Sequence, residues 1–318
     1  MRIIIITSGI SRLLEPIVDA EKVVGIIESK PRKKRSALKN FLHKFAFIYF
    51  RYFMKDEKNL AFFSKKRHIP YTKFFPKGDS TTKWIKILKP DLIVVYSMSQ
   101  LLKEDVFSIP KYGTINFHPS YLPMLRGPFP EFWYYYHTNL NPGGTVHFID
   151  KGEDTGDIIR QEKIEITLGI KSKKYFDLME GKLGVKLLLK SIDDIRSHKV
   201  KRIKQDKSIK FPRARNIKRE EHQSLIDWNN WPIERIWHLL RGTEQWLDAI
   251  PKPKFLFKGQ RWSIGKYIKK SNESISSDYE IIKIRGKFYL SLKEGLIELN
   301  VSFNLVNLIK NIILSGNK

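Results

Sequence analysis

The sequence contains no cysteine among its 318 residues. Disulfide bonds, zinc–thiolate centres and thiol nucleophiles are therefore excluded, and the cytoplasm is the expected location. There is no run of about eighteen apolar residues, so the sequence predicts no membrane-spanning helix. The apolar start at residues 2–10 lacks the long core and small-residue cleavage site of a signal peptide, and it is typical of a buried strand.

Acidic residues are few: 33 aspartates and glutamates stand against 59 lysines and arginines, a formal net charge of +26. Such an excess attracts nucleic acid, anionic lipid or phosphorylated small molecules, and it does not select one of them. Solvated faces of a lysine-rich protein explain it equally well. The hydrophobic share of 42% and the aromatic share of 13% exclude global disorder and predict packed cores.

The pattern of apolar runs predicts a large first domain. Strand-like runs alternate with helix-compatible stretches, which is typical of an α/β domain with a Rossmann-like, mostly parallel sheet. No G-x-G-x-x-G follows the first run, so the sequence gives no support for NAD. A helix over residues 172–198 is expected to close the domain, with Gly181 and Gly184 weakening its middle. The expected strands are residues 2–7, 23–27, 91–96, 114–118 and 145–150.

A smaller, β-rich and barrel-like domain is expected at the carboxyl end. The stretch before it, residues 199–219, holds ten basic residues and one acid, which is typical of a linker or an extended arm. A helix is predicted over residues 232–241, with a proline in its first turn. Strand-like runs follow at 255–257, 262–264, 279–284, 288–292 and 296–301. The expected organisation is a catalytic domain at 1–208, a basic linker at 209–225 and a C-terminal domain at 226–318.

Residues 30–67 form an insertion of distinct composition in the first domain. Five of the six residues from Lys30 to Arg35 are basic, and aromatic and aliphatic residues at helical spacing follow. Such stripes are usually buried, so we expect a helix docked on its own domain or on the second subunit of a homodimer. The alternative is peripheral contact of residues 36–55 with an anionic membrane.

Two polar loops carry the residues suited to catalysis. Asn116 and His118 stand two apart at the end of an expected strand, so their side chains share a face. About thirty residues later, a glycine-punctuated loop presents Asp154 after another apolar strand. A histidine held by a carboxylate suits proton transfer near neutral pH, and an amide donor suits developing negative charge. His147 has no such neighbours in the sequence and is assigned a structural role.

Residues 112–159, which contain both loops, resemble the folate-dependent formyltransferase family. Its members include methionyl-tRNA, glycinamide-ribonucleotide and sugar-nucleotide formyltransferases. The resemblance implies an enzyme that moves a formyl group from 10-formyltetrahydrofolate to an amine without a metal, and it places the catalytic residues on Asn116, His118 and Asp154. It places folate contacts on Ser120, Tyr121, Leu122 and Pro123, and further ones on Gln100, Leu101 and Leu102. Tyr121 departs from the aliphatic residue usual in that turn.

The acceptor amine is suggested by departures from the tRNA branch of the family. Residues 226–228, Ile-Asp-Trp, resemble a junction found in the tRNA and sugar branches. Trp246 lacks the flanking prolines typical of the tRNA enzymes, and Gly127 is followed by Pro-Phe-Pro where those enzymes have Ala-Ala-Pro. We therefore expect a nucleotide-linked amino sugar of surface polysaccharide biosynthesis, with initiator tRNA as the alternative. A basic RNA- or membrane-binding protein without turnover is a third interpretation.

Overall fold

Apolar runs in the first half of the chain form the strands of one sheet. The computed structural model describes residues 1–29, 59–75, 79–98, 100–206, 212–244, 246–253, 260–269 and 279–303. The chain packs as two compact units, called here the first and the second unit. The first unit contains Met1–Pro130, Asn141–Ile164 and Phe176–Arg215, and the second contains Glu131–Leu140, Glu165–Tyr175 and Asn216–Lys318.

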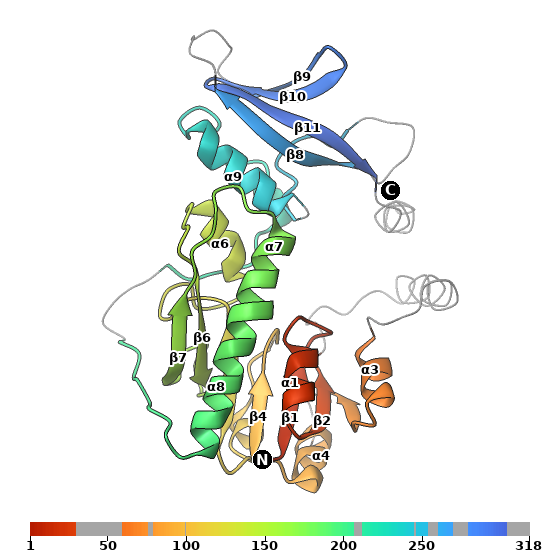
Figure 1. The fold of residues 1–318 in the computed structure, drawn as a ribbon, viewed down its shortest axis with the longest axis vertical. Helices are drawn as coiled ribbons and strands as arrows, with labels where there is room; N and C mark the ends of the chain where they lie inside the picture. Colours follow the sequence, from red (N-terminus) through yellow and green to blue (C-terminus); the bar gives the residue numbers. More distant parts are fainter. Residues whose placement is uncertain are drawn as a thin grey trace. The chain divides into compact units, whose positions relative to one another are not determined.

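The first unit is built on a seven-stranded sheet with the order β3-β2-β1-β4-β5-β6-β7 (Figure 1). The pairs from β3 to β5 are parallel, whereas β6 is antiparallel to both of its neighbours. The expected Rossmann-like, mostly parallel sheet is confirmed. The strands are β1 (Ile3–Thr7), β2 (Val23–Glu28), β3 (Tyr71–Lys73), β4 (Leu92–Val95), β5 (Thr114–His118), β6 (Gly143–Phe148) and β7 (Ile158–Lys163).

The central strands have the composition that burial on both faces requires. Every residue of β1 and of β4 is buried, and both strands consist almost wholly of isoleucine, valine and leucine. Continuous apolar runs of this kind are typical of parallel strands covered by helices on both sides. All five expected strands of this domain are present, whereas the sequence pattern did not predict β3 and β7.

Helices of the first unit follow these strands in the chain. The helix expected over residues 172–198 is present as three consecutive pieces, the second of which, η1, is a π-helix. The helical elements of this unit are α1 (Leu14–Ala20), α3 (Leu60–Lys66), α4 (Ser80–Leu88), α5 (Glu104–Phe107), η1 (Asp177–Gly184) and α8 (Val185–Arg196). The first piece of the long helix, α7 (Ser172–Phe176), belongs to the second unit up to Tyr175.

Two glycines let η1 and β6 close around Phe117 of β5. A Cβ atom at Gly184 would lie 2.9 Å from Cζ of Phe117, and one at Gly144 would lie 2.9 Å from its Cε2. Real Cβ atoms do not approach so closely, so larger residues would displace Phe117. Since Phe117 stands between Asn116 and His118, this packing fixes the part of β5 that carries them.

The second unit contains the C-terminal sheet. This sheet is antiparallel with four strands in the order β8-β11-β10-β9, which confirms the β-rich character expected for this region. Helix α9 begins immediately after Pro232, as the sequence predicts. The expected strand at 255–257 lies outside the described residues. The elements are α6 (Pro130–Tyr136), η2 (Arg219–Glu221), α9 (Ile233–Thr243), β8 (Gln260–Lys269), β9 (Glu280–Ile284), β10 (Lys287–Leu292) and β11 (Gly295–Phe303).

Most of the basic, aromatic insertion lies outside the described residues. Only residues 59–67 of it are described, and they contain α3. The expected docking of this segment and the alternative membrane contact of residues 36–55 therefore stay predictions. In the described ranges, no helix is long and apolar enough to cross a membrane.

Candidate active site

Four polar side chains share one face of the β5–β6 pair. Asn116 and His118 alternate with Phe117 on β5, and the antiparallel register sets His147 opposite Asn116 and Thr145 opposite His118. The amide Nδ2 of Asn116 lies 3.1 Å from Nε2 of His147. The two strands thus present a polar patch on an otherwise apolar sheet.

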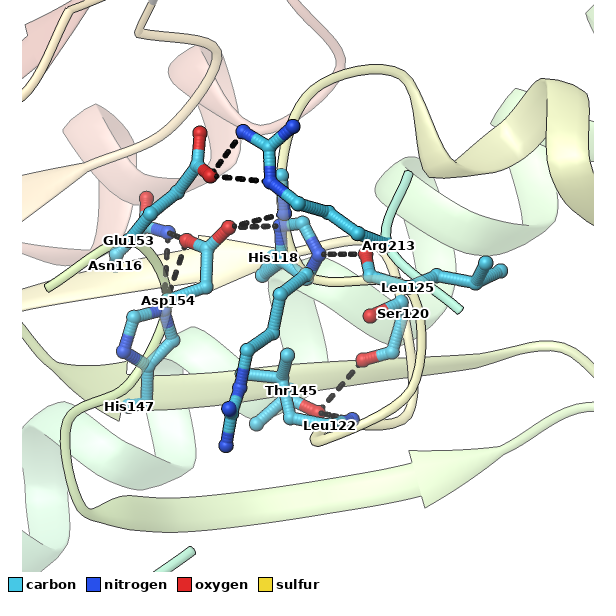
Figure 2. Close-up of polar contacts among 12 residues, drawn as sticks. Asn116, His118, Ser120, Leu122, Leu125, Thr145, His147, Glu153, Asp154 and Arg213 are labelled. Carbon is cyan, nitrogen blue, oxygen red and sulfur yellow. Dashed lines mark hydrogen bonds and ion pairs between the residues drawn. The ribbon is translucent and has the colours of Figure 1, made fainter. Parts of the chain in front are cut away.

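Asp154 approaches this patch from a loop that folds back over the sheet. Because β6 runs antiparallel to β5, the loop begins beside Ile115, at the opposite end of β5 from His118. The Asp154 Oδ2 atom nevertheless lies 3.5 Å from Nδ1 of His118, and Oδ1 lies 3.5 Å from Nε2 of His147 (Figure 2). The Asn116 amide is 3.4 Å from the same Oδ1 atom. One carboxylate therefore contacts all three side chains.

The surroundings of Asp154 decide its charge. Burial opposes ionisation, since the side chain is only 15% exposed. The charges of His118 and His147 and the N–H of Gly127, which donates to Oδ2 at 2.9 Å, outweigh that penalty and hold the pKa of the carboxyl well below its usual range. Asp154 is therefore ionised near neutral pH. Since a carboxylate of such low pKa is a weak base, it suits holding a histidine better than accepting a proton.

His118 is held at both ring nitrogens. Its Nε2 donates to the carbonyl of Leu125 at 2.9 Å, because a carbonyl can only accept, and its Nδ1 faces Asp154. Leu125 itself has a left-handed backbone, with φ of 55°. The ring is buried between the two loops that the sequence analysis singled out.

His147 belongs to the same cluster, although its neighbours in the sequence do not predict this. Its side chain is 2% exposed, and its Nδ1 donates to the carbonyl of Phe148 at 2.8 Å. Its Nε2 lies 3.1 Å from Nδ2 of Asn116 and 3.5 Å from Oδ1 of Asp154. Thr145 and His147 stand two apart on an expected strand, which indicates that they share a face. Only the antiparallel register shows that this face lies opposite His118 and Asn116.

We expect His147→Phe to lower turnover about tenfold, because it removes the ring contacts that position the half-buried Asn116 amide and the Asp154 carboxylate, a loss of roughly 1–3 kcal/mol. Turnover and the urea midpoint of the variant should both be measured. His238 is the matched control: it is also buried, accepts from the N–H of Gly169 at 2.8 Å, and lies in the second unit. His238→Phe should lose stability and keep its rate constant. Equal turnover in the two variants would show that His147 is only structural.

The turn expected to contact folate is fixed by Thr145. The Thr145 hydroxyl donates to the carbonyl of Ser120 at 2.7 Å and accepts from the N–H of Leu122 at 3.1 Å. Ser120 in turn donates to the carbonyl of Met124 at 2.7 Å, and the Leu122–Pro123 peptide is cis. The buried Ser120 and Leu122 hold the turn, which leaves half-buried Tyr121 and Pro123 nearer the surface.

Tyr121 packs against Gly143 of β6. A Cβ atom at Gly143 would lie 2.8 Å from Cβ of Tyr121, so the glycine makes room for the tyrosine that departs from the aliphatic pattern. The ammonium of Lys163 lies 4.8 Å from the centre of the Tyr121 ring, within range of a cation–π contact.

The second group of expected folate contacts follows β4. Leu102 packs into the hydrophobic core with Ile4 and Val95, whereas Leu101 is 56% exposed. Gln100 is half-buried. Ser97, at the start of this loop, has a φ of 51°, a conformation that favours glycine. Of these three expected contacts, Leu101 is the apolar side chain available to a ligand.

Comparisons with known proteins agree with the resemblance found in the sequence. The family described as formyl transferase matches residues 52–181. A methionyl-tRNA formyltransferase of Alkaliphilus oremlandii is 32% identical over 234 residues, which cover 74% of this chain and 70% of that enzyme. The chain therefore belongs to the formyltransferase family.

The sequence match spans only part of the first relative below, whereas the structural match spans almost all of a solved enzyme. A methionyl-tRNA formyltransferase of Clostridium beijerinckii is 36% identical over 180 residues, so the match spans only 55% of that relative and 57% of this chain. The solved N-formyltransferase of Helicobacter canadensis, in complex with folinic acid and dTDP-3-aminofucose, is 19% identical with a TM-score of 0.62. That likeness covers 95% of this chain and 99% of the other, and it shows that the two share a fold.

Proposed function

We propose that this protein is an enzyme that transfers the formyl group of 10-formyltetrahydrofolate to a primary amine. The observation that carries the proposal is the ionised, half-buried Asp154 in contact with His118, His147 and Asn116. Membership of the formyltransferase family supports the reaction type and the folate co-substrate. Clusters of this kind, with a perturbed carboxyl pKa beside histidines, are typical of acid–base catalysis.

The side chains match the needs of the reaction. The amine nitrogen attacks the formyl carbon, and the formyl oxygen gains negative charge in the tetrahedral species. The amide of Asn116 and the ring of His118 donate to that oxygen, with His118 Nε2 exchanging Leu125 for the substrate as its acceptor. The new carbon–nitrogen bond forms, the bond to N10 of the folate breaks, the amine loses a proton and N10 gains one. As the bond to N10 breaks, His118 gives its Nε2 proton to N10 and then takes up the proton that the amine loses, with Asp154 holding its ring.

Folate is proposed to lie against two loops of the first unit. Tyr121 and Pro123 are the less buried members of the turn, whereas Ser120 and Leu122 support it from beneath. Leu101 offers an exposed apolar side chain after β4, with Gln100 beside it and Leu102 anchoring the loop in the core. An apolar side chain close to polar backbone groups is the usual composition of a site for a flat heteroaromatic ring.

The proposed acceptor is the amino group of a nucleotide-linked amino sugar. The Pro-Phe-Pro after Gly127 and the absence of prolines around Trp246 support this choice over the tRNA branch. The fold likeness to an enzyme solved with dTDP-3-aminofucose extends over both proteins almost completely. Initiator tRNA is the second candidate, because sequence relatives at 30% identity or more are methionyl-tRNA formyltransferases.

A substrate panel tests the function directly. We expect the full chain with 10-formyltetrahydrofolate to release tetrahydrofolate when dTDP- or UDP-linked amino sugars are added, as measured by absorbance and by mass spectrometry of the formylated sugar. Methionyl initiator tRNA is the comparison substrate, and the Asp154→Asn variant is the control for uncatalysed transfer. Release with the tRNA alone would assign the protein to the second candidate. No release above the variant with any acceptor would contradict the enzymatic proposal.

A further inference from the structure

The basic stretch after α8 contributes an extended arm to the active site. Its described residues, 199–206 and 212–219, include the buried Gln205 and Ala214. The backbone of Ile203 pairs with that of Ile158 through two hydrogen bonds of 2.8 and 2.9 Å. Farther along, the N–H of Leu125 donates to Pro212 at 3.2 Å, and the N–H of Ala214 donates to Arg126 at 2.9 Å. The arm therefore pairs with the start of β7 before residues 207–211 and with the loop after β5 beyond them.

Gln205 connects the two loops through one amide group. Its Nε2 donates to the backbone carbonyls of Asp154, at 2.9 Å, and Gly156, at 2.8 Å. Its Oε1 accepts from Nε of Arg126 at 3.1 Å and from Nη2 at 2.6 Å. The amide orientation is unambiguous, because a guanidinium only donates and a carbonyl only accepts. Gln205 is 7% exposed, so these bonds are shielded from water.

Gln205 bonds the backbone of a loop that is strained at Asp154. Asp154 has a φ of 54°, in the left-handed region that is costly for residues other than glycine. Gln205 bonds the backbone carbonyl of this residue and that of Gly156, two residues later. A Cβ atom at Gly156 would lie 1.8 Å from the carbonyl oxygen of Phe148, so the loop also needs glycine there to lie on β6. The strained loop is thus fixed by the sheet beneath it and by Gln205.

Through Arg126, Gln205 is also connected to the loop after β5, which contacts His118 and Asp154. The residue before it, Leu125, accepts from His118, and the residue after it, Gly127, donates to Asp154. Arg126, whose guanidinium is anchored on Gln205, therefore joins in the chain the two residues whose backbone groups bind the acid–base pair. Loss of the anchor should alter both contacts together.

We infer that Gln205 is a positioning residue for Asp154 and His118, acting from a segment whose composition is that of a linker. The inference rests on the proposed function, in which Asp154 holds His118 for proton transfer. Gln205 touches neither side chain and acts through the backbone of residues 154 and 156 and through Arg126. Its substitution should therefore affect the chemical step more than the binding of folate.

The kinetic test compares Gln205→Met with Arg213→Ala in the full chain. Methionine keeps the length of the side chain and removes its donors and acceptor. Turnover should fall by about tenfold to a hundredfold, with the KM for 10-formyltetrahydrofolate unchanged, as expected when a catalytic group is displaced by a fraction of an ångström. Arg213 lies on the same arm and forms an exposed ion pair with Glu153, so its removal should change turnover by less than twofold. A larger or equal loss in Arg213→Ala would overturn the inference.

A second variant separates positioning from simple packing. Gln205→Glu keeps an acceptor for Arg126 and loses the donors to carbonyls 154 and 156, so it should not restore turnover. Turnover equal to the unsubstituted chain would show that the bonds to Asp154 and Gly156 are not needed. Urea midpoints of all three variants should be compared, since a role in stability alone would leave turnover per folded molecule unchanged.

A measurement without substrate distinguishes a failure of this inference from a failure of the proposed function. The imidazole ¹⁵N signals of His118 in the ligand-free chain report its contact with Asp154. In Gln205→Met these signals should shift in the direction seen in Asp154→Asn, and in Arg213→Ala they should stay in place. Unchanged His118 signals in Gln205→Met would overturn the inference, whereas absent turnover in the unsubstituted chain would contradict only the proposed function.

Discussion

Replacing Asp154 by asparagine is expected to lower turnover by roughly a hundredfold or more, as removal of an orienting group does in other acid–base sites. Asparagine has the same shape and can still accept from the N–H of Gly127. It loses the negative charge that faces Nδ1 of His118 and Nε2 of His147, both at 3.5 Å. Because the geometry is preserved and the charge is not, the effect should fall on turnover while folate binding is kept.

Stability at acid pH provides the control for this variant. The pKa of Asp154 is depressed on folding, so its contribution to stability is present above the unfolded carboxyl pKa of about 3.9 and is lost as the pH falls toward the folded value. The difference in unfolding free energy between the unsubstituted chain and Asp154→Asn should therefore shrink from about pH 5 to about pH 3. Single-turnover rates near those of the unsubstituted chain would contradict the orienting role.

The parts of the fold that could be predicted are those encoded locally. β1 and β4 are continuous apolar runs, and such runs have few alternatives to a strand covered on both faces. Helix α9 begins where Pro232 allows it to begin. Asn116, His118 and Asp154 could be named because two separate loops match one family in residue type and spacing, and the structure brings all three into contact.

The parts that could not be predicted depend on contacts between distant segments. His147 looked isolated because nothing local reveals that β6 runs antiparallel to β5, with His147 opposite Asn116. β3 is only three residues long and half-exposed, so its apolar signal is weak. Gln205 lies in a stretch whose charge is typical of a linker, and only its bonds to carbonyls 154 and 156 set it apart.

The order of segments along the chain does not predict which of them pack together in the second unit. Residues 131–140 and 165–175 group with the C-terminal part of the chain in the second unit, although both precede the basic stretch. Within that unit, the Tyr135 ring contacts Tyr175 and His238, and the N–H of Gly169 donates to His238. Packing of aromatic rings across such separations leaves no periodic signal in the sequence.

The second large loss of turnover is expected in His118→Ala, again by roughly a hundredfold or more. Alanine removes one of the two donors to the developing oxyanion and, within the described cluster, the side chain that contacts both Leu125 and Asp154. Asp154 keeps its contacts with His147, Asn116 and Gly127, so the loop should remain in place.

Two further measurements on His118→Ala distinguish a role in proton transfer from a role in folding or folate binding. Tetrahydrofolate binding, measured by calorimetry, should stay within about threefold of the unsubstituted chain, because His118 is expected to act in the transition state rather than in binding the ground state. Added imidazole should restore part of the turnover of His118→Ala and none in Asp154→Asn, where the ring is present and the charge is missing. Turnover near normal in His118→Ala, or a loss of folate binding as large as the loss of rate, would contradict the assignment of His118 as the proton carrier.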